Sequence, residues 1–583
     1  MTSARAQWKP TSFASDLPVY SSEVLWETMD AVPIARHGDR TAVICSSGPA
    51  WLADDGTFTQ VRLPDAVANC EEVHVAEGAL IGTDTKSGLY CAMVDWDCES
   101  VREMKRADLP TWEGEPYCIV TGDHLTVVDS GERRTRLYTA LIGDGELGEW
   151  SVRELPPMRD FEVVAATGTQ IAARMDLGPQ GDMVRVWTVG TSEADSLDFR
   201  SGYWTSVWST KDDRLYVAVR SPGDDIVAVI DETGRMRSSR APGNIGSLGG
   251  DSRTVLCAIF DGFQESVFRI TERQEGIGFE LVGKGPGKKR IGFGAPIWLS
   301  RSSVDGIRVE SAEDTVVIAP AARDRVPHAK YLASRGDGGP RALRVASADR
   351  HAGTIIHLHG GPESYETDEL RFFGLAPHSV SQGWDWRSLN YRGSRGVSPD
   401  HTTAAWKTWQ RSSIEDISWA IGPMPSRQPV ILAGWSFGAA LALAAAARLP
   451  VDGLILGGTM GPLADHVRVA SATDPSHESW FGDRFDLGGD DGDYFAYPVP
   501  ADSRNLGVLS FHGRGDAHCP YDLFEPVRER WSRKVRWTHY DLPGGGHYAE
   551  SMDDVDVIVA ETRRFIAGFA GRNASARPDH DGD

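Results

Sequence analysis

Short runs of aliphatic and β-branched residues, separated by glycine and aspartate turns, occupy the chain from about residue 40 to residue 320, and no amphipathic helix pattern interrupts them. Their spacing of roughly 40 residues per group is typical of four-stranded propeller blades. We therefore predict an all-β N-terminal β-propeller. About seven blades fit the length best, six or eight are compatible, and a pair of β-sandwiches is the alternative. Representative runs are Thr41–Cys45, Val184–Val189, Leu215–Val219, Ile226–Ile230 and Thr254–Ile259.

The C-terminal part of the chain contains a different pattern, in which an apolar run ends in a glycine-flanked turn and a helix-forming stretch follows. Val430–Ala433 leads into Gly434-Trp435-Ser436-Phe437-Gly438, and Ala439–Ala447 comes next. This order predicts a strand, a sharp turn and a helix, with the serine hydroxyl exposed at the end of a parallel strand. The two glycines allow the strained turn to approach its neighbours. Ser436 is therefore the candidate nucleophile.

A serine hydroxyl needs a base that takes its proton and an acid that orients the base. After a turn of this type the acid and then the histidine follow along the chain. Asp516 comes just after the strand-like run Leu506–Phe511, and His547 lies on a glycine loop before a helix-like stretch, so these two residues are the predicted acid and base. The same region holds residues that are alternatives for the two roles: Asp502, Asp541, His512, His518 and His539.

The oxyanion that forms when a serine attacks a carbonyl needs two backbone donors. One candidate is the N–H of Phe437, directly after the nucleophile. The second is predicted in the strand-like run that ends in His359-Gly360-Gly361-Pro362, where a glycine pair exposes a backbone amide. Gly361 is the preferred donor and Gly360 the alternative.

Five motifs in this part of the chain, taken in order, resemble those of the prolyl oligopeptidase family of serine peptidases. They are His359–Pro362, Asn390–Ser394, Gly434–Ala439, His512–Asp516 and Gly546-His547. The His-Gly-Gly-Pro form resembles the acylaminoacyl-peptidase and dipeptidyl-peptidase-like branches. The resemblance implies an α/β-hydrolase catalytic domain that carries Ser436, Asp516 and His547 and is joined to the N-terminal propeller.

The resemblance also suggests domain boundaries. We expect an N-terminal segment at residues 1–38, for which packing on the hydrolase domain is one possibility, a propeller at 39–322 and the α/β-hydrolase domain at 323–572. The polar residues 573–583 are expected to form a disordered tail.

Substrate-binding residues are less clear from the sequence. In the resembling family, aromatic and apolar residues after the nucleophile turn line the side-chain pocket, which implies Trp480 and Phe481, although both are equally compatible with core packing. Arg392 and Glu363 flank motif positions and could bind substrate or brace loops. Two positions after the acid, many relatives carry an arginine or asparagine that donates to a substrate carbonyl. This chain has His518 there, and we expect it to orient the substrate.

Composition and charge limit the partners, cofactors and location that we expect for this protein. The formal net charge of −23, from 83 acidic and 60 basic residues, argues against nucleic acid as a partner. The seven cysteines are scattered without metal or disulfide spacing, so no metal and no cofactor are expected, although Cys519 could line the site. No apolar run suggests a signal peptide or a membrane span, so we expect a cytoplasmic protein with no membrane partner; its oligomeric state stays open.

Three functions follow from these observations. The preferred one is a serine peptidase that hydrolyses short peptides or acylated amino acids through an acyl-enzyme, with the propeller limiting substrate size. The second is an esterase or transacylase that uses the same three residues on a small-molecule or peptide natural product. The third is a catalytically inactive, propeller-based binding protein.

Overall fold

The computed structural model describes residues 32–575, with interruptions. The interruptions are 38–39, 46–47, 54–57, 61–71, 77–78, 85–87, 96–99, 104–115, 122–123, 131–133, 144–145, 148, 156–161, 168, 177–181, 189–195, 201–203, 210–211, 221–224, 252, 263, 275, 286, 293–294, 303–305, 321–327, 334–338, 347–351, 368–370, 423–427 and 502–504. The proposed packing of the N-terminal segment concerns mainly residues 1–31, which lie outside the described residues.

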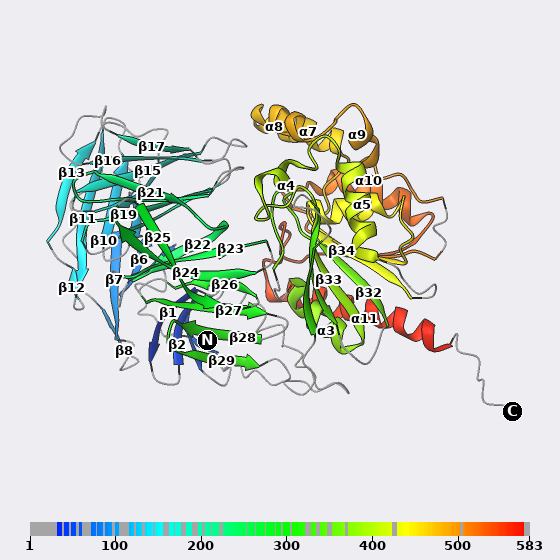
Figure 1. Cartoon of the computed structure of the whole chain (residues 1–583), viewed down its shortest axis with the longest axis horizontal. Helices are drawn as coiled ribbons and strands as arrows, with labels where there is room; N and C mark the ends of the chain where they lie inside the picture. The colour runs from blue at the N-terminus through cyan, green and yellow to red at the C-terminus, as the bar shows by residue number, and fades with distance from the viewer. Residues whose placement is uncertain are drawn as a thin grey trace.

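Seven small antiparallel sheets follow one another along the described part of residues 32–320 (Figure 1). Each sheet is built from strands that are consecutive in sequence: β1 Val32–His37, β2 Arg40–Cys45, β3 Gly48–Ala53 and β4 Phe58–Gln60; β5 Glu72–Ala76, β6 Ala79–Asp84, β7 Gly88–Asp95 and β8 Ser100–Glu103; β9 Pro116–Thr121, β10 His124–Ser130, β11 Thr135–Gly143, β12 Glu146–Leu147 and β13 Ser151–Leu155; β14 Glu162–Ala166, β15 Gln170–Asp176, β16 Asp182–Thr188 and β17 Leu197–Arg200; β18 Trp204–Ser209, β19 Leu215–Arg220, β20 Ile226–Ile230 and β21 Met236–Arg240; β22 Asn244–Gly250, β23 Val255–Phe260, β24 Glu265–Arg273 and β25 Gly276–Lys284; β26 Lys288–Ile291, β27 Ile297–Ser302, β28 Gly306–Ser311 and β29 Thr315–Pro320.

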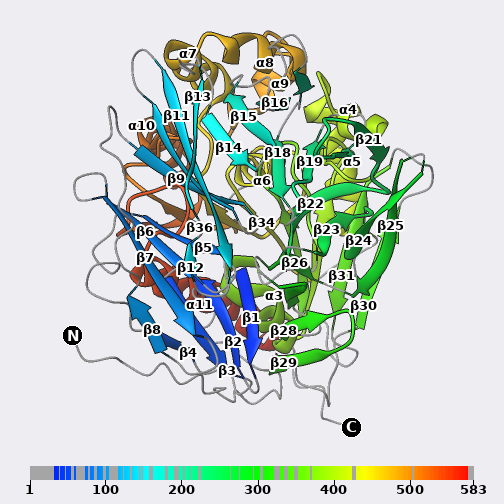
Figure 2. The same ribbon diagram turned by 90° about the vertical axis from the view of Figure 1, so that its left-hand side faces the viewer.

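The sheets succeed one another around a common centre (Figure 2), and strands β26 and β27 of the last sheet contact β1 of the first. Central strands such as β19 and β23 are buried on both faces because a neighbouring sheet covers each side. Outer strands such as β21 alternate between half-buried and exposed positions. This explains why the central strands are continuous apolar runs in the sequence rather than alternating ones. The described residues of this region form seven separate sheets, whereas two β-sandwiches would contain four.

The first sheet begins earlier than the boundary expected at residue 39. β1 pairs antiparallel with β2, and its Ile34 side chain is buried, so residues 32–37 belong to the all-β region. At the other end, the last helix continues to Ser575, past the expected start of the tail at residue 573.

An eight-stranded sheet with helices on both faces forms the C-terminal part of the chain. The strands lie in the order β30-β31-β33-β32-β34-β35-β36-β37; β31 is antiparallel to both β30 and β33, and the remaining neighbours are parallel. The strands are β30 His328–Ala333, β31 Arg341–Ala346, β32 Gly353–Leu358, β33 Trp384–Asn390, β34 Val430–Trp435, β35 Gly453–Gly457, β36 Gly507–His512 and β37 Arg536–Asp541. The helices are α3 Arg371–Ser381, α4 Pro399–Thr403, α5 Trp409–Ile421, α6 Phe437–Ala445, α7 Leu463–Thr473, α8 Ser476–Arg484, α9 Asp490–Tyr494, α10 Tyr521–Ser532 and α11 Met552–Ser575.

Side chains that alternate along the central strands separate two apolar cores. Ile355 and Ile431 pack with α3 and α11 on one face, while Ile356 and Leu432 pack with α5 and α6 on the other. All four side chains are fully buried. The carboxyl ends of the parallel strands are therefore held at one edge of a rigid sheet, which is where loops of such folds carry chemistry. No helix in the described residues has the length and apolarity that crossing a membrane requires.

The all-β and α/β regions are joined by buried polar and aromatic contacts. The Tyr365 hydroxyl donates to Glu265 Oε1 over 2.7 Å, and the Tyr365 ring stacks on Phe260 with ring centroids 4.2 Å apart. Arg395 also lies 3.5 Å from Asp225 Oδ1. The predicted class, an all-β region followed by an α/β region, is confirmed.

Candidate active site

Ser436 occupies a strained turn between β34 and α6. Its φ of 57° and ψ of −125° lie outside the conformations that residues with a side chain normally adopt, and its N–H donates to Gly457 O over 2.8 Å. A Cβ at Gly434 would come 2.4 Å from the Gly438 carbonyl carbon, and one at Gly438 would come 2.0 Å from Leu358 O. Both positions therefore need glycine for the turn to close.

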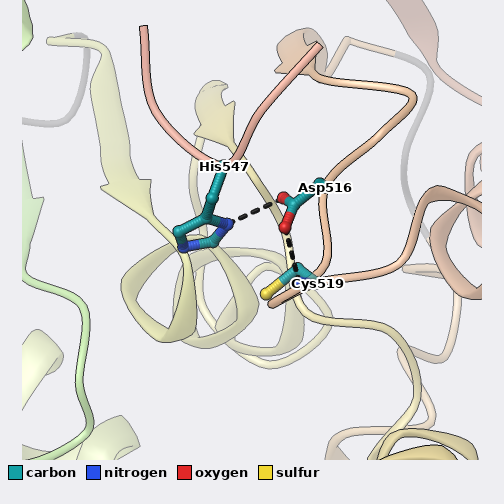
Figure 3. A group of neighbouring side chains, drawn as sticks. All are labelled: Asp516, Cys519 and His547. Carbon is teal, nitrogen blue, oxygen red and sulfur yellow. Dashed lines mark hydrogen bonds and ion pairs between the residues drawn. The ribbon is translucent and has the colours of Figure 1, made fainter. Parts of the chain in front are cut away.

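Asp516 and His547 form a hydrogen-bonded pair at the same edge of the sheet (Figure 3). His547 Nδ1 donates to Asp516 Oδ2 over 2.7 Å, and both side chains are buried. The Trp435 indole, in the residue before the turn, donates to the His547 carbonyl over 2.7 Å. The loop that carries the histidine is thereby tied to the loop that carries the serine.

The carboxylate of Asp516 receives hydrogen bonds on both oxygens. Besides His547, the N–H groups of His518 and Cys519 donate to Oδ1 over 2.9 and 2.7 Å, and His512 Nε2 lies 3.4 Å from Oδ2. Burial alone would raise the pKa of Asp516, but hydrogen bonds from His512, His547 and the Cys519 N–H outweigh burial and hold this pKa well below its usual value. The group is therefore a carboxylate at neutral pH.

The alternative residues have other partners. His512 donates through Nε2 to Cys519 O over 2.7 Å, so it braces the loop that carries Asp516. His539 bonds Ser510 Oγ over 2.7 Å, and Asp541 accepts from Arg514 over 2.8 Å. Asp502 lies outside the described residues. The spacing of His512 and Asp516 at i and i+4, across a glycine turn, could have indicated the bracing role.

The glycine pair after β32 lies against the serine. A Cβ at Gly360 would be 3.2 Å from Ser436 Cβ, and Gly361, at a φ of 125°, lines the same cavity as Ser436 and Phe437. His359 holds this loop because its Nε2 lies 2.6 Å from Ser394 Oγ and its Nδ1 lies 2.6 Å from Gly360 O. The candidate oxyanion donors therefore come from two loops that meet beside Ser436.

A cavity of about 730 Å³ opens next to these residues, and Ser436, His547, His518, Trp480 and Phe481 all contribute to its lining. Arg392 and Glu363 are not part of this lining. Arg392 donates to Asp416 and Glu415, and Glu363 accepts from Arg484 over 2.8 Å. Both side chains are therefore engaged in ion pairs with neighbouring segments.

Sequence reasoning missed the other wall residues, which lie on α7 and α8. His466, Val469, Ala470 and Thr473 are spaced i, i+3, i+4 and i+7, which puts them on one face of α7, and they line the cavity together with His477. This spacing was visible in the sequence, but which face would meet the cavity was not. Other lining residues are Met460, Phe485, Cys519, Pro520 and Tyr548.

His466 lies in the cavity wall against the ring of Phe481. Its Nδ1 is buried without a hydrogen-bond partner, and its ring lies edge-on to Phe481 with centroids 5.7 Å apart. Burial, and secondarily the nearby His477, lower the pKa of His466 to about 4. The imidazole is therefore neutral over the physiological range.

Cys519 places a thiol among these groups. Its side chain is buried, and burial, reinforced by the charge of Asp516, raises the pKa of this thiol well above its usual value. Ligand atoms of Asp516, Cys519 and His547 all lie within 4.8 Å of one another, and in the described part of the chain this is the one group of three or more His, Cys, Asp and Glu side chains close enough to hold a metal ion.

Comparison with known proteins identifies the fold. The sequence matches no protein-family model and no curated protein. Among solved structures, the chain is similar to the acylaminoacyl peptidase of Pyrococcus horikoshii, with 12% identity, a TM-score of 0.64 and coverage of 96% of this chain and 98% of that one. It is also similar to a puromycin hydrolase (15%, 0.64, 97% and 98%) and to dipeptidyl peptidase 4 of Porphyromonas gingivalis (12%, 0.56, 92% and 87%). The chain shares their fold over nearly its whole length.

The half-buried imidazole of His466 predicts a pH-dependent stability. Because its folded pKa is depressed from 6.5 to about 4, its contribution is fully present above pH 6.5 and is lost as the pH falls toward 4. The melting temperature of the wild type should therefore fall more steeply over this window than that of His466→Gln, while above pH 7 the two profiles should run parallel. Equal slopes throughout would show that His466 is not held neutral.

Proposed function

We propose that this protein is a serine peptidase of the prolyl oligopeptidase family that cleaves short peptides or acylated amino acids through an acyl-enzyme. The observation that carries the proposal is the meeting of three groups from distant segments. Ser436, on a strained turn, lines the same cavity as His547, and His547 is hydrogen-bonded to the buried carboxylate of Asp516. The shared fold with acylaminoacyl peptidase and dipeptidyl peptidase 4 supports it.

In the proposed mechanism, His547 takes the proton of Ser436 through Nε2, because Nδ1–H is bound to Asp516. No hydrogen bond joins the Ser436 hydroxyl to His547 in the described structure, and such contacts commonly tighten only when substrate binds. Asp516 fixes the tautomer and stabilises the imidazolium. The N–H groups of Phe437 and Gly361 stabilise the oxyanion, the leaving amine takes the proton from His547, and water then hydrolyses the acyl-enzyme.

The residues that line the cavity favour a particular class of substrate side chain. Trp480, Phe481 and Phe485 provide aromatic walls, so an apolar or aromatic side chain next to the scissile bond fits best. Of the described residues that line the cavity, none carries a carboxylate, and four are histidines. A lysine or arginine side chain would therefore be buried there without a counter-ion. We propose that His518, whose ring centroid lies 5.2 Å from that of His547, contacts the substrate backbone.

We further propose that the seven small sheets form a β-propeller, and that the eight-stranded region is an α/β-hydrolase domain. The domains proposed from the sequence, 39–322 and 323–572, then extend to include β1 and the end of α11. The contacts through Tyr365 and Arg395 hold the propeller against the loops after β32 and β33. In this position the propeller restricts access to the cavity. We propose that substrates are limited in size for this reason.

The alternative function keeps the same residues but changes the substrate. A puromycin hydrolase shares the fold, and its name indicates puromycin as its substrate. A related acylaminoacyl peptidase has been solved in complex with Z-Gly-Gly-Phe-chloromethyl ketone, a peptide-like inhibitor, which favours peptides. The proposed setting remains the cytoplasm. An inactive binding protein is disfavoured, because it would have no need of the strained Ser436 or the buried Asp516–His547 pair.

The nucleophile is tested by covalent labelling. Ser436→Ala should fold normally, lose all labelling by a fluorophosphonate probe and lose activity by about 10³-fold or more, because triad members act as a unit. Asp516→Asn should also lower labelling and turnover strongly, by about 10⁴-fold, because it removes the acceptor for His547. Labelling that persists in Ser436→Ala would show that another residue is the nucleophile.

Substrate selectivity is tested with peptide reporters that differ only in the side chain before the scissile bond. We expect phenylalanine to exceed lysine in kcat/KM by about 100-fold or more, because a buried ammonium without a partner costs several kcal/mol. Thr473 is exposed within the cavity wall, so Thr473→Glu should raise kcat/KM for the lysine reporter, whereas the matched Thr473→Gln should not. Equal cleavage of both reporters by the wild type would contradict the proposed pocket.

The size limit is tested with one cleavable sequence in three contexts: as a short peptide, inside a stable folded domain, and in the same domain after it has been irreversibly unfolded. The short peptide should be cleaved efficiently and the folded domain should resist. The unfolded chain separates the effect of length from the effect of folded bulk. Efficient internal cleavage of the folded domain would refute the proposed role of the propeller.

A further inference from the structure

The group formed by Asp516, Cys519 and His547 contains a thiol that the proposed peptide hydrolysis does not use. The thiol lies three residues after the acid, on the loop between β36 and α10, while His547 comes from the loop before α11 (Figure 3). Their exposed fractions are 4%, 4% and 8%, and the ligand atoms lie within 4.8 Å of one another.

We propose that Asp516, Cys519 and His547 form a binding site for a thiophilic divalent cation of the Zn²⁺ or Cd²⁺ class, and that the bound cation inhibits hydrolysis. The metal is an inhibitor and not a cofactor, because the proposed hydrolysis needs none. Only the effect on activity rests on the proposed function; the binding itself does not.

The ligand set suits such a cation. Thiolate, imidazole and carboxylate are the three ligand types that zinc takes in proteins, at about 2.3 Å for sulfur and about 2.0–2.2 Å for nitrogen and oxygen. Ligand atoms in a tetrahedral complex of this size are roughly 3.3–3.7 Å apart. The separations of up to 4.8 Å in the free protein can close through small side-chain rotations.

Charge balance favours the same cation. Binding releases the thiol proton to solvent, and the thiolate and carboxylate together neutralise the two positive charges, while the imidazole stays neutral. The buried complex therefore carries no net charge, which keeps its desolvation cost low. Because all three residues or their loops border the cavity, the cation has an entry path and a water molecule can fill the fourth position.

Binding would stop catalysis by a direct route. A metal on either ring nitrogen of His547 removes a proton site: coordination at Nε2 blocks the base, and coordination at Nδ1 breaks the hydrogen bond to Asp516. The described cysteines offer a matched control. Cys257 is also a buried free thiol, but it lies in β23 and belongs to no comparable group.

The binding site can be tested without activity by titrating full-length protein with Co²⁺ and following the thiolate-to-metal charge-transfer band. Wild type, Ser436→Ala and Cys257→Val should each develop the band, and Cys519→Val should not. Thermal unfolding of each variant without metal verifies folding. Absence of the band in the wild type, or its presence in Cys519→Val, would overturn the proposal. Because Ser436→Ala is included, this result does not depend on the protein being a hydrolase.

Inhibition is tested with buffered free Zn²⁺, each variant being compared with its own metal-free rate. Wild type and Cys257→Val should be inhibited at the same low Zn²⁺ concentration and should recover on addition of EDTA. Cys519→Val should need a concentration higher by about 100-fold, since it lacks one of three ligands. Equal sensitivity of Cys519→Val and wild type would place the inhibitory metal elsewhere, for example on the imidazoles of His466 and His477, and would refute the proposed site.

Discussion

The close contact between Gly438 and the end of β32 is the constraint on which the rest of the site depends. An added Cβ at this glycine would lie 2.0 Å from Leu358 O and 2.5 Å from His359 O, so helix α6 starts directly against the neighbouring strand. This contact brings the Ser436 turn next to the Gly360–Gly361 loop. It also accounts for the positive φ of Ser436. This backbone strain is tolerated because packed cores on both faces of the sheet hold the turn in place. The position of the candidate nucleophile relative to both candidate oxyanion donors is therefore a consequence of one close backbone contact.

The buried carboxylate of Asp516 organises the second half of the site. A buried charge is tolerated only when donors surround it, and here backbone N–H groups, His547 and His512 meet this need. The same donors order the loops after β36 and before α11. The geometry that orients the proposed base is therefore also the geometry that keeps these loops folded. It brings the Cys519 thiol into the group as well, because the Cys519 N–H is one of the donors.

The cavity and the molecular surface differ in charge. The chain as a whole carries a formal charge of −23, which acts on approaching molecules at long range. The cavity next to Ser436 is instead lined by aromatic residues and imidazoles, and none of its described lining residues is acidic. Long-range attraction of cations and local rejection of a buried cationic side chain are thus separate effects.

The sequence by itself determined the repeated strands of the all-β region, the strand-turn-helix around Ser436 and the candidate acid and base, because each depends on a local pattern of a few residues. Only the tertiary structure decided that Arg392 and Glu363 bind the carboxylates and guanidinium of neighbouring loops rather than line the cavity. It also decided which face of α7 borders the cavity and that Cys519 lies beside His547, 28 positions further along the chain. These contacts join distant segments through packing of the whole sheet, and neither periodicity nor spacing along the chain encodes which segments will meet.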